Sequence, residues 1–174
     1  MAYLDSQKND FNSYKVLKQS LSSLPKIKLV KPKYSEKEIT YTKYTLLPCI
    51  KDIFNEESNK GLIIRGPINP LKGKFFGGDY LSDISISFER RPLIGIEVKL
   101  LKSEGRHQSL STAIGQTLIY ALGQYERAVL FIIDEKLNID KDELDVLRKR
   151  LYKNNVTLVY FNFSRNDNHI RFIE

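Results

Sequence analysis

The chain contains a single cysteine, Cys49, among its 174 residues. One cysteine excludes a disulfide framework within the chain and a cysteine-rich zinc site. No apolar run approaches the ~20 residues that a membrane-spanning helix needs, and residues 1–15 lack the apolar segment of a signal peptide. We therefore expect an intracellular, cytoplasmic protein that has no membrane partner.

Three common catalytic sequence motifs are also missing. The sequence has no P-loop pattern G-x-x-x-x-G-K-[ST], no H-E-x-x-H pair and no glycine-rich dinucleotide fingerprint. These absences remove the sequence support for P-loop nucleotide hydrolysis, for zinc proteolysis of the H-E-x-x-H type and for Rossmann-type dinucleotide binding.

Acidic side chains are outnumbered by basic ones. The chain has 28 Lys and Arg residues against 21 Asp and Glu residues, which gives a net charge of +7. A domain with this excess of positive charge suggests a polyanionic partner, most simply nucleic acid. General solubility is the competing explanation, so the charge alone does not decide the partner.

The length favours one folded domain preceded by an arm. Residues 1–35 form the predicted basic arm, with one short helix in 14–24 and a connector rich in proline and lysine from residue 25 onward. Residues 36–174 are predicted to form a single α/β domain.

Hydrophobic periodicity predicts the secondary structure of this domain. Apolar residues at helical spacing favour a helix over 35–55, with Ser35 and Glu38 in a capping-box pattern and either a kink or two abutting helices at Pro48. Residues 69–81 are glycine-rich and basic, which favours a loop. The other predicted elements are, in order, strands 61–68, 82–89 and 93–101, helix 109–125, strand 127–134, helix 140–153, strand 156–163 and an edge strand in 169–174. This order predicts an α/β fold with a mixed central sheet flanked by helices.

Two adjacent predicted strands carry the candidate site. Asp83 precedes the alternating run 84–88, and Glu97 and Lys99 share one face of the following strand. If the strands pair antiparallel, the two carboxylates converge, and two carboxylates with a backbone carbonyl suit Mg²⁺ or Mn²⁺. A lysine beside such an ion can orient a water or neutralise charge on a phosphoryl group. The competing explanation is a ladder of salt bridges on a solvated sheet face.

The segment SDISISFERRPLIGIEVKLLK (82–102) resembles the signature of the PD-(D/E)XK nuclease superfamily, in which an aspartate starts one strand and acid-x-Lys follows on the next. Ser82 stands where the family name has proline. In the following helix, GQTLIYALG (115–123) places Gln116 four residues before Tyr120. That spacing resembles the Q-x-x-x-Y helix of RecB-like members and of related viral and archaeal nucleases. The predicted element order over about residues 36–163 is similar to the αβββαβ core of the restriction-endonuclease-like fold.

The resemblance implies a metal-dependent deoxyribonuclease that hydrolyses phosphodiester bonds and selects DNA by its structure. Asp83, Glu97 and the backbone carbonyl of Val98 would be ligands of Mg²⁺ or Mn²⁺. Lys99 would position the attacking water and stabilise the developing charge.

Three further assignments follow from the same resemblance. Many members use a glutamate of the first helix, and Glu38 is the candidate here, with helix capping as its competing role. Asp79 is the alternative to Asp83 as the first metal ligand, because both have the same parity if the strand begins early. Gln116 and Tyr120 would support the site or contact the nucleic-acid backbone.

Basic residues near this site are the candidate nucleic-acid contacts. Lys72 and Lys74 lie among glycines, which allow a backbone to approach phosphates closely. Arg106, just before the predicted helix 109–125, is a further candidate. For Phe75 and Phe76, packing on the core is favoured over stacking on bases. The alternatives to a nuclease are a non-catalytic nucleic-acid-binding module and an assembly subunit on the same fold. A homodimer would suit a duplex or junction, and a viral member would act in the host cytoplasm.

Overall fold

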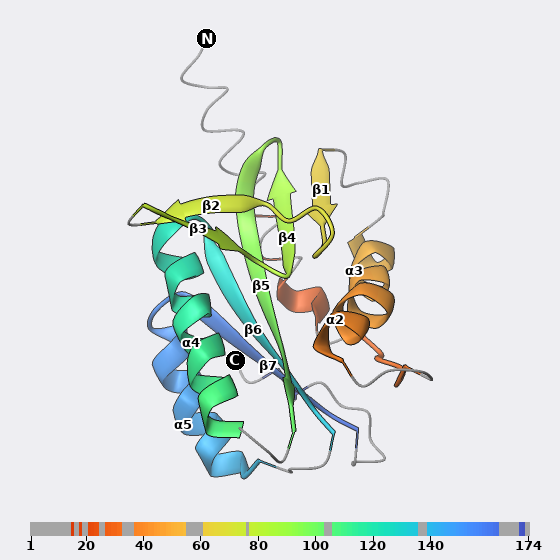
Figure 1. Ribbon diagram of the computed structural model, residues 1–174, viewed down its shortest axis with the longest axis vertical. Helices are drawn as coiled ribbons and strands as arrows, with labels where there is room; N and C mark the ends of the chain where they lie inside the picture. Colours follow the sequence, from red (N-terminus) through yellow and green to blue (C-terminus); the bar gives the residue numbers. More distant parts are fainter. Residues whose placement is uncertain are drawn as a thin grey trace.

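The computed structural model of the chain describes residues 15, 18, 21–24, 27–32, 37–54, 61–75, 77–102, 106–135, 139–163 and 171–172. A mixed six-stranded sheet forms its centre (Figure 1). The strands lie in the order β1 (Leu62–Arg65), β4 (Ile84–Phe88), β5 (Arg91–Leu101), β6 (Arg127–Asp134), β7 (Val156–Asn162) and β8 (Arg171–Phe172).

The early strands pair antiparallel, and β5, β6 and β7 run parallel to one another. The parallel strands β6 and β7 are nearly continuous apolar runs that are buried along almost their whole length, as expected for strands covered on both faces. The prediction of an α/β fold with a mixed sheet flanked by helices is therefore confirmed.

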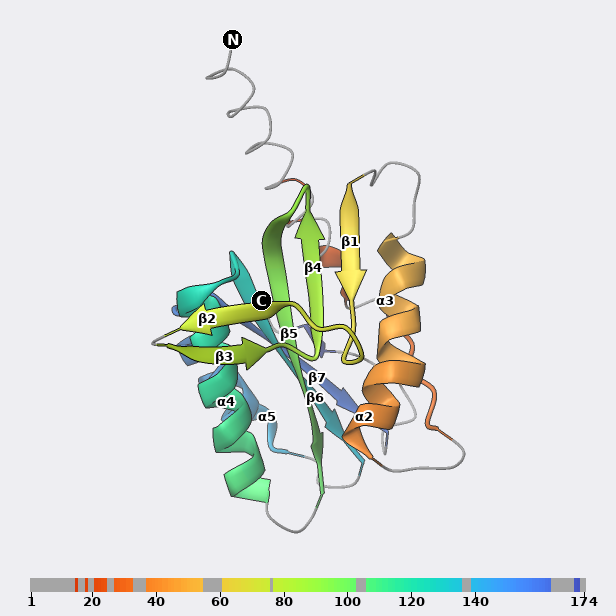
Figure 2. The ribbon, with the colours of Figure 1, turned by 45° about the horizontal axis from the view of Figure 1, so that its top comes forward.

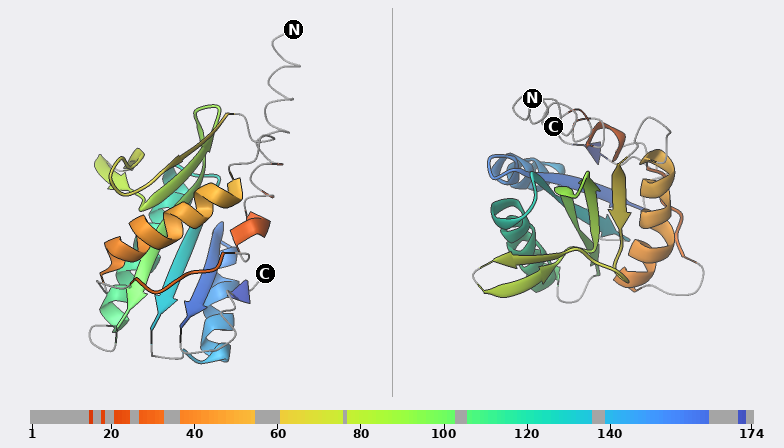
Figure 3. Two further views of the ribbon diagram at one scale, coloured as in Figure 1. Left: turned by 90° about the vertical axis from the view of Figure 1, so that its right-hand side faces the viewer. Right: turned by 90° about the horizontal axis from the view of Figure 1, so that it is seen from above.

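Helices cover both faces of the sheet, as the view from above shows (Figure 3). One face carries α4 (Arg106–Gly123) and α5 (Lys141–Tyr152). The other face carries three consecutive helical segments: α2 (Glu38–Tyr41), the π-helical turn η2 (Thr42–Leu46) and α3 (Leu47–Phe54). None of the described helices has the length and apolar character needed to cross a bilayer.

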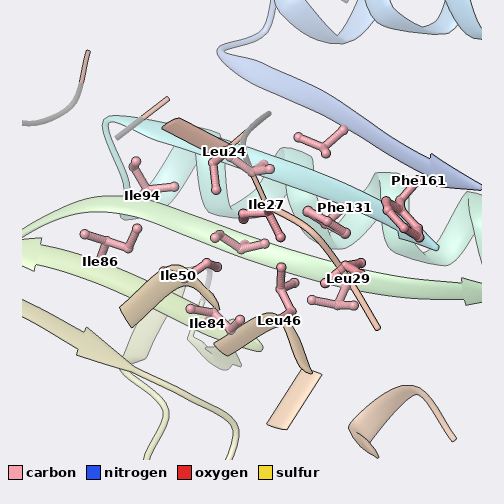
Figure 4. Packing of buried hydrophobic residues seen from close by; sticks show 14 of the residues in the cluster. Leu24, Ile27, Leu29, Leu46, Ile50, Ile84, Ile86, Ile94, Phe131 and Phe161 are labelled. Atoms are coloured by element: carbon pink, nitrogen blue, oxygen red, sulfur yellow. The ribbon is translucent and has the colours of Figure 1, made fainter. Parts of the chain in front are cut away.

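Strand alternation divides the apolar side chains between two cores. Ile84, Ile86 and Ile94 point to the face covered by η2 and α3, where they meet Leu46 and Ile50 (Figure 4). Leu24, Ile27 and Leu29 are buried in the same core. This part of the predicted basic arm is therefore not a solvated connector, because its alternate apolar residues complete the core beneath the helices.

The first helix begins at Glu38 and contains a wider turn just before Pro48. Ser35 lies outside the described residues, the helix begins at Glu38 after Lys37, and no side chain caps it. Glu38 is thus not a capping-box residue, because its carboxylate is engaged elsewhere. Near Pro48, the helix contains the π-helical turn η2. A proline has no N–H to donate to the carbonyl four residues earlier, and the wider turn directly before it accommodates that loss.

The prediction of a loop over 69–81 is wrong. Strands β2 (Lys72–Phe75) and β3 (Gly78–Leu81) form a separate two-stranded hairpin, which packs across the C-terminal end of α4 (Figure 2). Gly73 lies so close to Gln124 that an added Cβ would meet the Gln124 side-chain oxygen at 1.7 Å. Glycines that suggested a loop instead let a strand approach a helix closely.

Candidate active site

The site forms where one edge of β5 loses its neighbouring strand. Strand β4 pairs with β5 only as far as Ile84 opposite Ile96, so the amides of Val98 and Leu100 have no strand partner on that side among the described strands. Side chains take over the role of acceptor. Oδ2 of Asp83 accepts a hydrogen bond from Val98 N at 2.8 Å, and a second carboxylate serves Leu100.

That second carboxylate belongs to Glu38, the first residue of α2. Its Oε2 accepts a hydrogen bond from Leu100 N at 3.0 Å and lies 3.1 Å from Nζ of Lys99. The helix start and the end of β5 are therefore joined by one carboxylate. In Figures 1 and 2, α2 lies on one side of the start of β4 and the β2–β3 hairpin on the other.

Glu97 lies on the α4 side of the sheet and is only 6 % exposed. Its Oε2 is 2.9 Å from the hydroxyl of Tyr120 on α4, and the same hydroxyl lies 2.7 Å from the Leu81 carbonyl oxygen. One hydroxyl proton cannot serve both acceptors. Both contacts are satisfied together when Glu97 is protonated and donates to Tyr120, while Tyr120 donates to Leu81.

The electrostatics agree with a protonated Glu97. Its pKa is raised to about 8, chiefly by burial and then by the charge of Asp83, against the lowering effect of the Tyr120 hydrogen bond. The pKa of Asp83 is raised to about 6, chiefly by burial, while the Val98 amide lowers it and Glu38 raises it. Burial and the neighbouring Glu97 likewise raise the pKa of Tyr120. Three carboxyl groups thus share a partly buried place with one lysine, and that lysine cannot balance the charge of all three in their ionised forms.

A divalent cation would fit this shortage of positive charge. In the described part of the chain, no three His, Cys, Asp or Glu side chains stand close enough to hold a metal ion by themselves. Mg²⁺, however, is commonly held by one or two carboxylates and keeps several waters. Asp83 and Glu97 each have one oxygen in the hydrogen bonds described above, which leaves Oδ1 and Oε1 for an ion. In a strand, the carbonyl of Val98 points to the same open edge as its amide.

The structure separates the two candidates for the first acidic ligand. Asp83 reaches the edge of β5 directly. Asp79 is exposed on β3, opposite Lys74 in the hairpin register, and takes no part in the carboxyl cluster. Lys72 and Lys74 are exposed on β2, on the outer face of the hairpin. The Phe75 ring packs on the end of α4, where a Cβ added at Gly123 would lie 2.6 Å from it, and it contacts the Tyr80 ring of the same hairpin. Phe76 lies outside the described residues.

Two residues predicted from the helix after β5 are placed less directly. Gln116 is half-buried on α4, one turn before Tyr120 on the same side of the helix, and no described hydrogen bond joins it to the carboxyl cluster. Arg106 lies in the first turn of α4 instead of before the helix, and its side chain lies outside the described residues.

Sequence reasoning did not single out Tyr125. Its hydroxyl lies 2.7 Å from Oγ of Ser82, and its ring meets that of Tyr120 edge to face at 6.1 Å. Tyr125 therefore holds both the residue before Asp83 and the partner of Glu97. The departure at Ser82 from the proline of the family name was the only signal in the sequence, because it introduces a hydroxyl directly before the first acid.

Comparisons of the chain with protein-family models, with curated proteins and with solved structures find no match.

Proposed function

We propose that the protein is a metal-dependent nuclease that hydrolyses phosphodiester bonds in DNA. The observation that carries the proposal is the convergence of Asp83, Glu97 and Lys99 at the open edge of β5. Carboxyl groups lacking positive charge, beside one lysine, suit the binding of a cation and a phosphate together. The net charge of +7 favours a polyanionic substrate.

Each side chain would have a defined role in the reaction. Asp83, Glu97 and the Val98 carbonyl would hold Mg²⁺ or Mn²⁺. When bound, the ion would lower the pKa of a coordinated water and polarise the phosphate. The Lys99 side chain is 21 % exposed. Its three protons exceed what Glu38 accepts, and the remaining ones can donate to the attacking water or to a phosphate oxygen.

Tyr120 would act as a positioning residue. Its hydroxyl bridges the Leu81 carbonyl oxygen and the Glu97 carboxyl, so it links the end of β3 to β5. This link fixes the rotamer of Glu97 and the path of the chain just before Asp83.

A non-cleaving nucleic-acid-binding module or an assembly subunit is the alternative function. It is favoured by one observation: Asp83 and Glu38 already accept hydrogen bonds from backbone amides. Both carboxylates therefore stabilise the edge of β5 whether or not an ion is bound.

Cleavage assays distinguish the two functions. We would incubate the protein with labelled single-stranded, duplex, flap and four-way-junction DNA in Mg²⁺, Mn²⁺ or EDTA. A nuclease should cleave at least one substrate only with a divalent ion. Glu97→Gln and Lys99→Ala should each lower the rate by about 100-fold or more.

Matched controls come from exposed residues with the same charges. Asp79→Asn removes a carboxylate from the nearby hairpin, and Lys141→Ala removes a lysine from the first turn of α5. Both controls should keep the wild-type rate within about twofold, as expected for surface changes. Salt-sensitive DNA binding without cleavage of any substrate would contradict the nuclease and support the binding module.

A further inference from the structure

The outer face of α2 and η2, the helical stretch that begins with Glu38, carries an exposed aromatic side chain. Tyr44 is 65 % exposed, and Ile39 on the same helical stretch is 49 % exposed. Nζ of Lys43 lies over the Tyr44 ring, 4.7 Å from its centroid. The attraction between this cation and the ring restrains the ring. The part of the ring that is exposed can stack on a flat group such as a base.

Backbone geometry accounts for this arrangement. Residues 42–46 form a π-helical turn, in which Thr42, Thr45 and Leu46 are buried while Tyr44 points outward. Turns of this kind occur frequently at functional sites. Exposure of Tyr44 is thus not a consequence of a surface loop, since the turn lies within a helical segment whose inner side packs on the core.

The position of this face relates it to the carboxyl cluster. Glu38, which joins Lys99 and Leu100, precedes Lys43 by five residues on the same helical stretch. At 1.5 Å of rise per residue, this corresponds to about 7.5 Å along the axis. A nucleic-acid strand advances about 3.4 Å per stacked nucleotide, so this axial distance corresponds to about two nucleotides.

We propose that Tyr44 and Lys43 bind an unpaired nucleotide next to the phosphate held at the carboxyl cluster. A base would stack on Tyr44, and Lys43 would contact a phosphate. Stacking needs a base whose face is accessible, so the preferred substrate is single-stranded DNA or DNA with a single-stranded arm. This inference rests on the proposed function, because it assigns a substrate class to that same site.

The charge of the surface favours nucleic acid over an apolar protein partner. Within residues 37–54, which the structure describes, the basic side chains are Lys37, Lys43 and Lys51, and the acidic ones are Glu38 and Asp52. Glu38 is neutralised by its ion pair with Lys99. The outer face is therefore positive and complements a phosphate backbone.

Binding measured in EDTA tests the inference without any need for cleavage. We would measure fluorescence anisotropy with a labelled single-stranded oligonucleotide and with a blunt duplex. Tyr44→Ala should weaken single-strand binding by about tenfold or more, and Tyr44→Phe should stay within twofold of wild type. Blunt-duplex binding should be the same for wild type and Tyr44→Ala.

A second exposed tyrosine provides the matched control. Tyr152 on α5 is 57 % exposed and has the guanidinium of Arg127 at 5.0 Å from its ring centroid, but α5 covers the opposite face of the sheet. Tyr152→Ala should leave single-strand binding unchanged. Wild-type affinity in Tyr44→Ala, or an equal loss in Tyr152→Ala, would overturn the inference, as would an equal loss of duplex binding.

The outcomes separate this inference from the proposed function. If the protein never cleaves DNA but its binding of single strands depends on Tyr44, the proposed nuclease activity is refuted and the nucleotide-binding face is supported. If Tyr44→Ala changes neither metal-dependent cleavage nor the binding of single strands, the nuclease activity is supported and the nucleotide-binding face is refuted. Self-association that Tyr44→Ala abolishes, in a protein that binds no oligonucleotide, would assign the face to a second copy of the chain and overturn the inference.

Discussion

Replacement of Glu97 by glutamine should stabilise the metal-free protein at alkaline pH. Folding takes this carboxyl from a pKa of 4.5 to one of about 8, mainly because it is buried. Between these two values the folded state binds the proton more tightly than the unfolded state does. The stability of the wild type therefore falls as the pH rises from 4.5 through 8. Glutamine carries no charge, so the variant should lack this loss.

The size of the effect follows from the pKa change. Each pKa unit corresponds to about 1.4 kcal/mol, so ionisation of Glu97 in the folded state costs at most roughly 5 kcal/mol. Asp83 and Glu97 interact, and the cost belongs to the pair. We therefore expect Glu97→Gln to gain about 2–4 kcal/mol over wild type at pH 9 and less than about 1 kcal/mol at pH 5.

Urea denaturation in EDTA at pH 5, 7 and 9 measures this difference. Glu126→Gln serves as the control, because Glu126 is a half-exposed carboxylate that pairs with Arg91 at 2.6 Å, away from the cluster. The control should follow the wild type within about 0.5 kcal/mol at every pH. The reasoning is refuted if Glu97→Gln is less stable than wild type at pH 9, or if both proteins lose stability equally between pH 5 and 9.

Three further predictions concern the same region. Mg²⁺ or Mn²⁺ at pH 8 should raise the melting temperature of wild type and raise that of Glu97→Gln less, because a bound ion stabilises only the folded state that holds it; equal shifts measured by calorimetry would argue against a site at Glu97. Tyr120→Phe removes the hydroxyl that lies between Leu81 and Glu97 and should cost about 1–2 kcal/mol in urea denaturation, since it leaves the buried Glu97 carboxyl without this partner; an unchanged stability would contradict this. Gly95→Ala should lower the free energy of unfolding by about 1–3 kcal/mol, because its Cβ would lie 2.5 Å from the buried ring of Tyr125. Gly115→Ala, with open space around it in α4, should raise that free energy by up to about 1 kcal/mol.

Much of the fold was predictable because the sheet strands show their burial in the sequence. The continuous apolar runs gave β6 and β7 within one residue of their observed ends, and strict alternation gave the faces of β4 and β5. The hairpin of β2 and β3 was missed, since three glycines favour a loop by local preference. Only the tertiary contact of Gly73 with the Gln124 side chain shows what the glycine does there, which is to let the strand lie close to the end of α4.

The carboxyl cluster was predictable only in part. Alternation placed Asp83 opposite Glu97 under the condition that the strands pair antiparallel, and they do. Glu38 could not be placed from the sequence, because its role depends on where the pairing between β4 and β5 stops. Its local pattern with Ser35 favoured helix capping. In the structure, its carboxylate instead accepts a hydrogen bond from the Leu100 amide, which has no strand partner on that side among the described strands.

The choice of side chains at this edge argues for a role beyond structure. Two strand amides need only neutral acceptors, and an asparagine or a glutamine could satisfy them without the cost of burying charge. Instead, Asp83 and Glu38 are carboxylates and a third carboxyl lies at Glu97. Burial first, and then the neighbouring carboxylates, raise the pKa values of Asp83 and Glu97. Three neighbouring carboxyl groups are unfavourable in their ionised forms in the protein alone, and a bound cation makes the ionised forms favourable. Asp83→Asn should therefore keep the fold and the Val98 hydrogen bond but lose the stabilisation by Mg²⁺, which calorimetry with and without the ion would measure; full retention of that stabilisation would assign Asp83 to edge capping alone.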